Sequence, residues 1–528
     1  MTAVAFTAPR AEVAQMGLEW LADGATAVDA MVAASAAIAV AYPHMNSLGG
    51  DGFWLIQAAG QAPVGIDACG FAAQGASIDG YRDAGFDAIP ARGPQAALCQ
   101  AGTLDGWRLA RNWCRDNGFP QRPLPDLLVP ATALAENGVS VTGSLQAASE
   151  KLDRENCAFQ AYLDVFQPDG RPLRAGDRLG NLALAGFLRR LAERGTEDFY
   201  RGALGAAVAE HLASLGSPLR LADFLDYRAR PATPLSTCIA GAELFNLPPP
   251  TQGIASLILL AVYDRLRERL APATEAARVH CLVEATKLAF RIRDREVGDP
   301  ARLSATFDQL LSAAALDRLA AQVRADAALP WPQAATPGDT VWMGALDRHG
   351  TLVSFIQSLY WEFGSGMVVP EFGLVWNNRG MSFQMDAAHR NALVPRHRPL
   401  HTLNPALALL ADGRRLAYGA MGGDGQPQTQ AALFTRFFHE GASLSEAIAR
   451  PRWLLGRTWG SADADLKLER SLATEIGAEL AAKGHVLSEL PDRSEAMGHA
   501  GAICVDRQGR VEAATDPRSD GAALVAPA

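Results

Sequence analysis

Residues 339–360 read DTVWMGALDRHGTLVSFIQSLY, a sequence that predicts a β-hairpin. Its first part, residues 340–346, contains β-branched and aromatic side chains and predicts a strand. Asp347-Arg348-His349-Gly350 is typical of a hairpin loop, and residues 351–360 predict the returning strand. Thr340 therefore stands at the first position of a strand hairpin.

The segment before this hairpin has a different composition. Residues 313–337 are rich in Ala, Asp and Pro, and they predict an exposed tail rather than a packed element. At Gly338-Asp339 the chain thus changes abruptly from a loose linker to a strand. For an isolated threonine at the start of a strand, simple β-propensity is the ordinary explanation.

The amino-terminal part predicts a helical hairpin followed by a strand. Apolar residues at helical spacing predict a helix over residues 12–21, and Thr26 with Asp29 predicts the capped start of a second helix. That second helix ends at Tyr42-Pro43. A glycine-rich turn at residues 49–52 then leads into a strand over residues 53–57.

Helices dominate the middle of the chain. Residues 103–212 are mainly helical, with loops where Pro and Gly gather. The loop PPPTQG at residues 248–253 precedes an apolar helix over residues 254–270, and a further helix covers residues 275–295. The sequence therefore predicts both helices and sheet, without internal repeats.

The overall composition is that of a globular enzyme-sized chain. The 528 residues are 49% hydrophobic and 20% charged, with a net charge of −9. Because nucleic acids and anionic membranes attract basic surfaces, we expect neither as a partner. The apolar stretch at residues 27–41 contains Asp29 and is shorter than the roughly 20 residues that span a bilayer, so it predicts a buried helix.

The cysteines and the amino terminus bear on the cellular compartment. Seven scattered cysteines without a Cys-x-x-Cys pair argue against both a disulfide framework and a zinc site. Residues 1–10 have neither the basic nor the apolar region of a secretory signal. We therefore expect a cytoplasmic protein. The histidines lack the spacing of metal ligands, so we expect no metal and no other cofactor.

Several different short motifs follow one another along the chain in a particular order. They are TAVDA at 26–30, GGDG at 49–52, GTLDG at 102–106, PPPTQG at 248–253, EATK at 284–287, GDP at 298–300, NN at 377–378, RPL at 398–400, MGG at 421–423 and DPRS at 516–519. In this order they resemble the γ-glutamyltranspeptidase family of N-terminal-nucleophile hydrolases, across nearly the whole chain.

The resemblance implies a fold and a maturation step. The expected fold is α+β, a four-layer αββα sandwich of two antiparallel sheets between helical layers. The family's precursor cuts itself, which here would fall between Asp339 and Thr340 and give a large subunit of residues 1–339 and a small subunit of residues 340–528. The freed α-amine of Thr340, with a pKa of about 7.7, could then deprotonate the Thr340 hydroxyl.

The resemblance also implies further catalytic residues. Gly422 and Gly423 match the family's paired glycines, whose backbone N–H groups bind the negative charge that develops on the attacked carbonyl. Ser358 matches a threonine that hydrogen-bonds the nucleophile. The structural alternatives are a simple tight turn for the glycines and an ordinary strand position for Ser358.

The chain departs from the family's pattern where a γ-glutamyl substrate would bind. The departures are Cys69 for an arginine, Tyr360 for an asparagine, Arg379 for a glutamine, Ser382 for an aspartate, and His401-Thr402 for a pair of serines. A guanidinium that faced a substrate ammonium would repel it. Strong binding of a γ-glutamyl group is therefore not expected.

The same departures favour a small amide that has a carboxylate but no amine. Arg379 could hold such a carboxylate as a bidentate clamp, with Tyr360, His401 and Thr402 lining the substrate site. Oxamate is the simplest such molecule, and the chain looks similar to the family's oxamate amidohydrolase branch, which serves purine catabolism. Arg379 is equally compatible with a surface arginine or an internal ion pair, and His401 with a packed, hydrogen-bonded side chain.

Three other functions stay open at this point. They are a γ-glutamyl hydrolase or transferase, an acylase for glutaryl or cephalosporin side chains, and an inactive relative that serves as a binding protein. The expected partners are a small-molecule amide and the two subunits of one precursor, with a homo-oligomer of the processed heterodimer as a further option.

Overall fold

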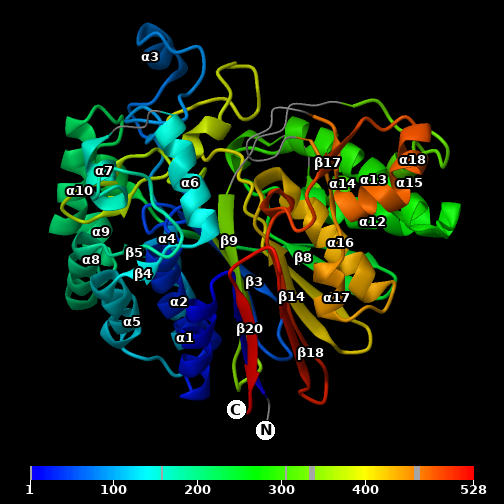
Figure 1. The fold of residues 1–528 in the computed structure, drawn as a ribbon, viewed down its shortest axis with the longest axis horizontal. Coiled ribbons are helices and arrows are strands. Elements are labelled where there is room, and N and C mark those ends of the chain that lie inside the picture. The colour runs from blue at the N-terminus through cyan, green and yellow to red at the C-terminus, as the bar shows by residue number, and fades with distance from the viewer. Residues whose placement is uncertain (1–2, 156–158, 304–305, 332–338, 457–463) are drawn as a thin grey trace.

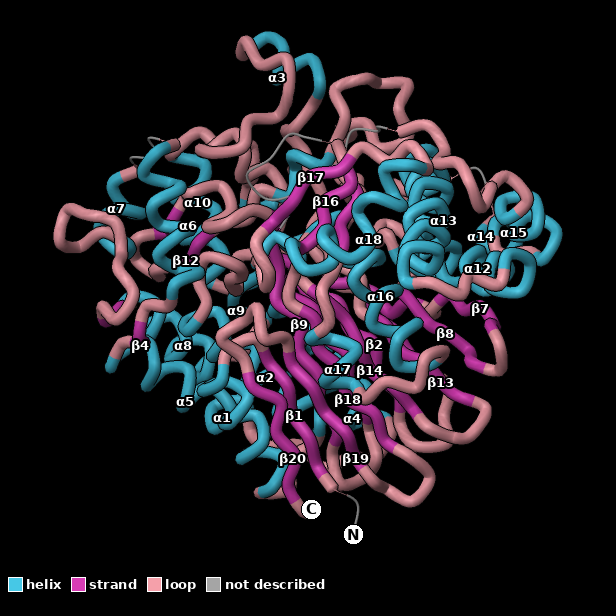
Figure 2. The backbone as a smooth tube through the Cα atoms, turned by 45° about the vertical axis from the view of Figure 1, so that its right-hand side comes forward, coloured by secondary structure: helices cyan, strands magenta, loops and turns pink. Residues whose placement is uncertain are grey.

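Two large antiparallel sheets lie face to face in the computed structural model, and helices cover the outer face of each (Figures 1 and 2). The structure describes residues 3–155, 159–303, 306–331, 339–456 and 464–528. This architecture confirms the expected α+β sandwich with its αββα order of layers.

The first sheet has seven strands, and the predicted hairpin lies inside it. Its order is β20 (Ala522–Ala526), β1 (Val4–Ala8), β9 (Asp339–Leu346), β10 (Leu352–Tyr360), β2 (Asp51–Gln57), β3 (Val64–Ala68) and β6 (Arg230–Ala232). The hairpin of β9 and β10 confirms the sequence prediction within one residue at each end. Because β1 and β10 flank β9, the strand that contains the predicted nucleophile is internal.

The second sheet has six strands. Its order is β19 (Val511–Thr515), β18 (Ala500–Val505), β14 (Arg415–Ala420), β13 (Ala406–Leu410), β8 (Ala242–Asn246) and β7 (Leu235–Ile239). Smaller ladders join β4 (Val139–Ser140) with β5 (Arg178–Leu179), β11 (Val368–Val369) with β12 (Leu374–Val375), and β15 (Trp453–Leu455), β16 (Leu466–Glu469) with β17 (Leu487–Leu490).

An apolar layer between the two sheets fixes their spacing. Trp342 of β9 lies at its centre, and its ring nitrogen donates to Ser354 Oγ at 2.9 Å. A Cβ atom on Gly419 would approach the indole of Trp342 to 2.1 Å, and one on Gly501 would approach it to 2.4 Å. The ring therefore rests directly on the backbone of β14 and β18, which only glycine permits.

Helices of the amino-terminal half cover the seven-stranded sheet. They are α1 (Ala11–Ala22), α2 (Ala27–Ala41), α3 (Ile78–Asp83), α4 (Thr103–Asp116), α5 (Leu124–Asn137), α6 (Gly143–Arg154), α7 (Gln160–Phe166), α8 (Leu182–Arg194), α9 (Glu197–Arg201), α10 (Ala203–Ser214) and α11 (Leu221–Asp226). Of these, α1, α2 and α4 pack directly on the sheet. The predicted cap is present, since Thr26 Oγ1 accepts from Asp29 N at 3.1 Å, and every residue of α2 is buried.

A second group of helices covers the six-stranded sheet. It comprises α12 (Gly253–Leu270), α13 (Glu275–Glu296), α14 (Phe307–Leu310), α15 (Ala313–Ala320), α16 (Gln426–Phe438), α17 (Leu444–Ala449) and α18 (Arg470–Ala482). The predicted helices over residues 254–270 and 275–295 are thus confirmed. No helix in the described part of the chain has the length and apolar character that crossing a bilayer requires.

The prediction of an exposed tail over residues 313–337 was wrong for its first part. Residues 313–320 form α15, which packs on α12, and Leu316 and Val323 are buried. The abundance of alanine, taken as a sign of a loose segment, instead supplies a short helix with one buried face. Residues 332–338 lie outside the described part of the chain.

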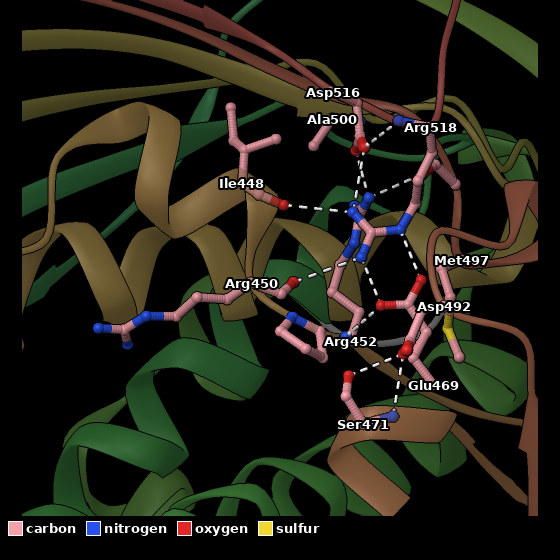
Figure 3. Close-up of polar contacts among 12 residues, drawn as sticks. Ile448, Arg450, Arg452, Glu469, Ser471, Asp492, Met497, Ala500, Asp516 and Arg518 are labelled. Carbon is pink, nitrogen blue, oxygen red and sulfur yellow. Dashed lines mark hydrogen bonds and ion pairs between the residues drawn. The ribbon is translucent and has the colours of Figure 1, made fainter.

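Four buried charged side chains fasten the end of the chain to the six-stranded sheet (Figure 3). Arg518 donates from Nε to Glu469 Oε1 at 2.7 Å and from Nη1 to Asp516 Oδ1 at 3.1 Å, and Arg452 also pairs with Asp516. Asp516 Oδ2 in turn accepts from Ala500 N at 2.7 Å. The cluster therefore fixes the start of β18, the neighbour of β14.

Removal of one cation from this cluster should destabilise the protein strongly. Arg518→Met leaves two buried carboxylates with Arg452 as their remaining arginine partner, and we expect a loss of about 3–5 kcal/mol in the free energy of unfolding. Equilibrium urea unfolding followed by tryptophan fluorescence measures this loss. The control is Arg510→Met, because Arg510 pairs with Asp506 while 82% exposed, and its loss should stay below about 1 kcal/mol. Equal losses in the two variants would contradict this account.

Candidate active site

Thr340 occupies the second position of β9 and is 1% exposed. The strand pairing is irregular at this point. Gln357 pairs with Val341 and Tyr360 pairs with Asp339, so Thr340 faces two residues of β10, Ser358 and Leu359. Such β-bulges bend a strand and redirect its side chains, and they are common beside active sites. The bulge thus brings Ser358 next to Thr340.

The backbone on the far side of the bulge has an uncommon conformation. Tyr360 has a φ of 87°, which a bulky residue rarely adopts. Its backbone N–H donates to Ser358 Oγ at 2.8 Å, which holds the bulge in place. The expected site residues Ser358 and Tyr360 are therefore parts of one local structure.

The paired glycines lie in the loop between β14 and α16. Gly422 has a φ of 118° and Gly423 a φ of 53°, so both adopt the left-handed conformations that glycine favours. Gly425 N donates to Gly422 O at 2.8 Å, and Met421 N donates to His499 O at 3.0 Å. The loop is thus held at both ends.

The loop that contains Gly422 and Gly423 lies close to Thr340, and Gln426 makes the contact. Gln426, the first residue of α16, is fully buried, and its Nε2 lies 3.5 Å from Thr340 Oγ1. The structure therefore brings the end of the glycine loop close to Thr340, although the two are about 80 residues apart in the sequence.

Gln252 connects the glycine loop to the neighbouring substrate-site loop. Its Nε2 donates to Gly423 O at 2.9 Å and to Thr402 O at 2.7 Å. Its Oε1 accepts from Arg293 Nη1 at 3.0 Å, and the same nitrogen donates to Asp424 Oδ1 at 2.7 Å. Since these groups are all buried, the network holds both loops rigidly.

Arg379 is a buried cation with only part of its donors in use. The residue is 1% exposed, and its guanidinium carbon lies 3.9 Å from the centre of the Tyr360 ring. Nη1 donates to Thr402 Oγ1 at 3.2 Å. Nε and Nη2, although buried, have no hydrogen-bond partner among the described residues. Burial lowers the pKa of Arg379, because the charged guanidinium loses its contact with water. An anion at Nε and Nη2 would offset the free-energy cost of burying this charge.

A second arginine nearby is fully engaged by the protein. Arg398 donates from its backbone N to Asp299 Oδ2 at 2.6 Å and from Nε to Cys69 O at 3.2 Å. Its Nε also lies 3.7 Å from Asp67 Oδ2. The Arg398 guanidinium therefore has a carboxylate partner in Asp67. Nε and Nη2 of Arg379, which we call its inner edge, have none among the residues that the structure describes.

Asp51 and His401 form a hydrogen-bonded pair beside Arg379. His401 Nδ1 accepts from Leu403 N at 3.2 Å, so Nε2 is the nitrogen that donates to Asp51 Oδ2, at 2.9 Å. Burial holds the pKa of His401 well below its usual value, which keeps the ring neutral. Both ring nitrogens of His401 are thus occupied by the protein, and this agrees with the packed alternative rather than with direct contact to a substrate.

Burial also raises the pKa of Asp51 to about 7, against the lowering effect of the Arg379 guanidinium. Sequence reasoning assigned Asp51 only to a glycine-rich turn, and it missed Gln252, Arg293 and Gln426 as site residues. The available signals were the motifs GGDG and PPPTQG, which contain Asp51 and Gln252. Gln252, Arg293 and Gln426 contact the site through partners far away in the sequence.

Among the residues that the structure describes, two groups of side chains have donor atoms close enough together for a metal ion. They are Asp51, Cys69 and His401, and His280, Glu284 and His485. In the first group, His401 already donates to Asp51 and burial raises the pKa of the Cys69 thiol well above its usual value. In the second, Lys287 Nζ lies 2.6 Å from Glu284 Oε1 and fills the place of a cation. We therefore assign neither group to a metal.

The chain is similar to known proteins over its full length. It is 49% identical over 516 residues to the oxamate amidohydrolase proenzyme of Klebsiella pneumoniae. The match covers 98% of this chain and 97% of that protein. It is 35% identical over 518 residues to the glutathione hydrolase-like YwrD proenzyme of Bacillus subtilis, which covers 98% and 97%.

A solved structure supports the same relationship. The cephalosporin acylase of Bacillus halodurans superimposes with a TM-score of 0.88 at 29% sequence identity, over 99% of this chain and 96% of that one. The family model described as gamma-glutamyltranspeptidase matches residues 13–526. The chain therefore belongs to the γ-glutamyltranspeptidase family of N-terminal-nucleophile hydrolases.

Proposed function

We propose that this amidohydrolase cuts itself before Thr340 and then hydrolyses oxamate to oxalate and ammonia. The observation that carries the choice of substrate is the inner edge of Arg379, two buried donors that no described residue meets. The 49% identity to a protein named oxamate amidohydrolase supports the same choice.

The first step of the proposal is maturation. The Thr340 hydroxyl attacks the carbonyl of Asp339, the peptide rearranges to an ester, and water releases a small subunit of residues 340–528 from a large subunit of residues 1–339. The bulge opposite Thr340 supports this step, because it departs from regular strand pairing at the bond to be cut. The positive φ of Tyr360 adds strain at the same place.

The second step is nucleophilic attack on the substrate. The freed α-amine of Thr340, with a pKa of about 7.7, accepts the proton of the Thr340 hydroxyl. The backbone N–H groups of Gly422 and Gly423 stabilise the negative charge on the attacked carbonyl oxygen. Ser358, beside Thr340 in the bulge, orients the hydroxyl. The amine passes this proton to the substrate nitrogen, which leaves as ammonia. Water then hydrolyses the acyl-threonine ester, and the Thr340 hydroxyl is regenerated as oxalate departs.

Recognition of the substrate is assigned to its carboxylate. Nε and Nη2 of Arg379 form a planar edge that matches the two oxygens of a carboxylate. Thr402 holds Nη1, and Tyr360 stacks on the guanidinium, so the edge is held in one orientation. Gln252 links Thr402 to Gly423, which fixes the carboxylate site relative to the oxyanion site.

A competing function is hydrolysis of γ-glutamyl amides, as the resemblance to glutathione hydrolase-like proteins suggests. Acylase activity is the other alternative, since the acylase structure is similar throughout. Steady-state rates on oxamate, a γ-glutamyl anilide and a glutaryl amide separate the three. Turnover of the anilide or the glutaryl amide alone would overturn the choice of oxamate.

Replacement of the nucleophile should block maturation as well as turnover. Thr340→Ala removes the hydroxyl that attacks Asp339, so we expect one band at 56.0 kDa on a denaturing gel and no activity. Thr340→Ser keeps a hydroxyl and serves as the control, with two fragments and residual activity. Two fragments from Thr340→Ala would contradict self-cleavage by this residue.

Loss of the Arg379 guanidinium should weaken binding of the anionic substrate. Arg379→Ala removes two charge-assisted hydrogen bonds, and we expect kcat/KM for oxamate to fall by at least about 100-fold after normal maturation. Arg379→Lys keeps the charge but not the planar fork, so its loss should be smaller. Oxamide, which has no carboxylate, is the control substrate. Equal losses on oxamate and oxamide would refute the clamp.

The affinity for the substrate should depend on pH through Asp51. Its pKa of about 7 means that the carboxyl is mainly neutral below this pH and ionised above it. An ionised Asp51 puts a second negative charge near Arg379 and opposes the substrate carboxylate, so the KM for oxamate should rise from about pH 6 to about pH 8. Kinetics at intervals of pH test this expectation. Asp51→Asn, neutral throughout, should flatten the rise, and a rise that persists in this variant would exclude Asp51 as its source.

A further inference from the structure

Three glutamines at the start of α16 have different environments. In the sequence QPQTQ at residues 426–430, all three side chains are buried. Gln428 uses both ends of its amide, donating to Leu455 O at 3.0 Å and accepting from Leu455 N at 2.8 Å. Gln430 likewise donates to Asn404 O and accepts from Ser256 Oγ at 3.1 Å. These two glutamines therefore have structural roles.

Gln426 differs from both. Its Nε2 lies 3.5 Å from the nucleophile Thr340 Oγ1, and its Oε1 is buried without a hydrogen-bond partner among the described residues. A buried acceptor without a donor costs free energy, so such a group in a folded protein calls for an explanation. In this case the explanation must lie within reach of the nucleophile.

We propose that Gln426 is a catalytic residue that recognises the leaving nitrogen. Its Oε1 accepts a hydrogen bond from an N–H of the substrate's scissile amide while its Nε2 donates to Thr340 Oγ1. This inference rests on the proposed function, because it assumes that Thr340 attacks an amide. Gln426 thereby selects amides over esters that have the same acyl group.

The chemistry of the step requires such an acceptor. Thr340 Oγ forms a bond to the amide carbon, the C–N bond breaks, and the hydroxyl proton passes through the Thr340 amine to the departing nitrogen, which leaves as ammonia. The nitrogen of a primary amide brings two N–H donors among buried side chains, and a buried donor without an acceptor is costly. An ester oxygen brings none.

The test compares an amide with an ester of the same acid. For wild-type protein and for Gln426→Met, kcat/KM is measured on oxamate and on monomethyl oxalate. Gln426→Met keeps the length of the side chain but lacks the oxygen acceptor, so the amide-to-ester ratio should fall about tenfold. Loss of the contact to Thr340 Oγ1 lowers both rates and cancels in the ratio.

Two control variants separate this role from a structural one. Gln428→Met, in the same helix, should lower stability and leave the ratio unchanged. Gln426→Glu keeps an oxygen acceptor and should keep the ratio within about threefold of wild type. The cut fraction of each variant is measured on a denaturing gel, and rates refer to cut protein. If Gln426→Met stays uncut, Gln426→Asn, which withdraws the amide by one methylene group, takes its place.

The outcomes distinguish this inference from the proposed function. An unchanged ratio in Gln426→Met, or an equal fall in Gln428→Met, overturns the role of Gln426. Absence of oxamate turnover by wild-type protein overturns the proposed substrate instead. In that event the same ratio is measured on glutamine and the γ-methyl ester of glutamate, where a fall supports the role of Gln426 and an unchanged ratio again overturns it.

Discussion

The contact of the Trp342 indole with Gly419 and Gly501 is the interaction on which the site depends. Trp342 lies two residues after Thr340, and Gly419 lies three residues before Gly422. Because the ring rests on the backbone of β14 and β18, it sets the distance between the two sheets at this level. That spacing brings the start of β9, in one sheet, against the loop that follows β14, in the other. Thr340 and the loop that contains Gly422 and Gly423, the proposed nucleophile and oxyanion site, lie close together for this reason.

The charges around the site divide into those the protein neutralises and one that it does not. Arg293, Arg398 and Arg518 each face carboxylates at hydrogen-bonding or ion-pair distance. Arg379 is as deeply buried as these, yet its inner edge meets no acceptor among the described residues. An unpaired buried cation destabilises a folded protein, so its presence calls for a function that offsets this cost. In the proposed function a small anionic substrate supplies the missing partner of Arg379, and the proposed role of Gln426 follows from the same reasoning about its unmet acceptor.

Local sequence patterns predicted the elements but not the environment of the site. The hairpin at residues 340–360, the capped helix after Thr26 and the helices over residues 254–270 and 275–295 follow from periodicity and turn chemistry, which act over a few residues. The prediction of an exposed tail at residues 313–337 was wrong for residues 313–320, because the burial of α15 depends on its packing against α12, which is far away in the sequence. Asp51, Gln252 and Gln426 escaped notice for the same reason. Arg379 stood out only as a departure from the family, and its unmet donors became visible with the fold.

The central claim is that the Thr340 nitrogen becomes a free amine before the enzyme works. Intact-mass and amino-terminal analysis of protein with measured amidase activity tests this most directly. The account predicts two chains, residues 1–339 and residues 340–528, with threonine as the first residue of the shorter one, and activity proportional to the cut fraction. Full activity from protein in which residues 339 and 340 are still joined would contradict it.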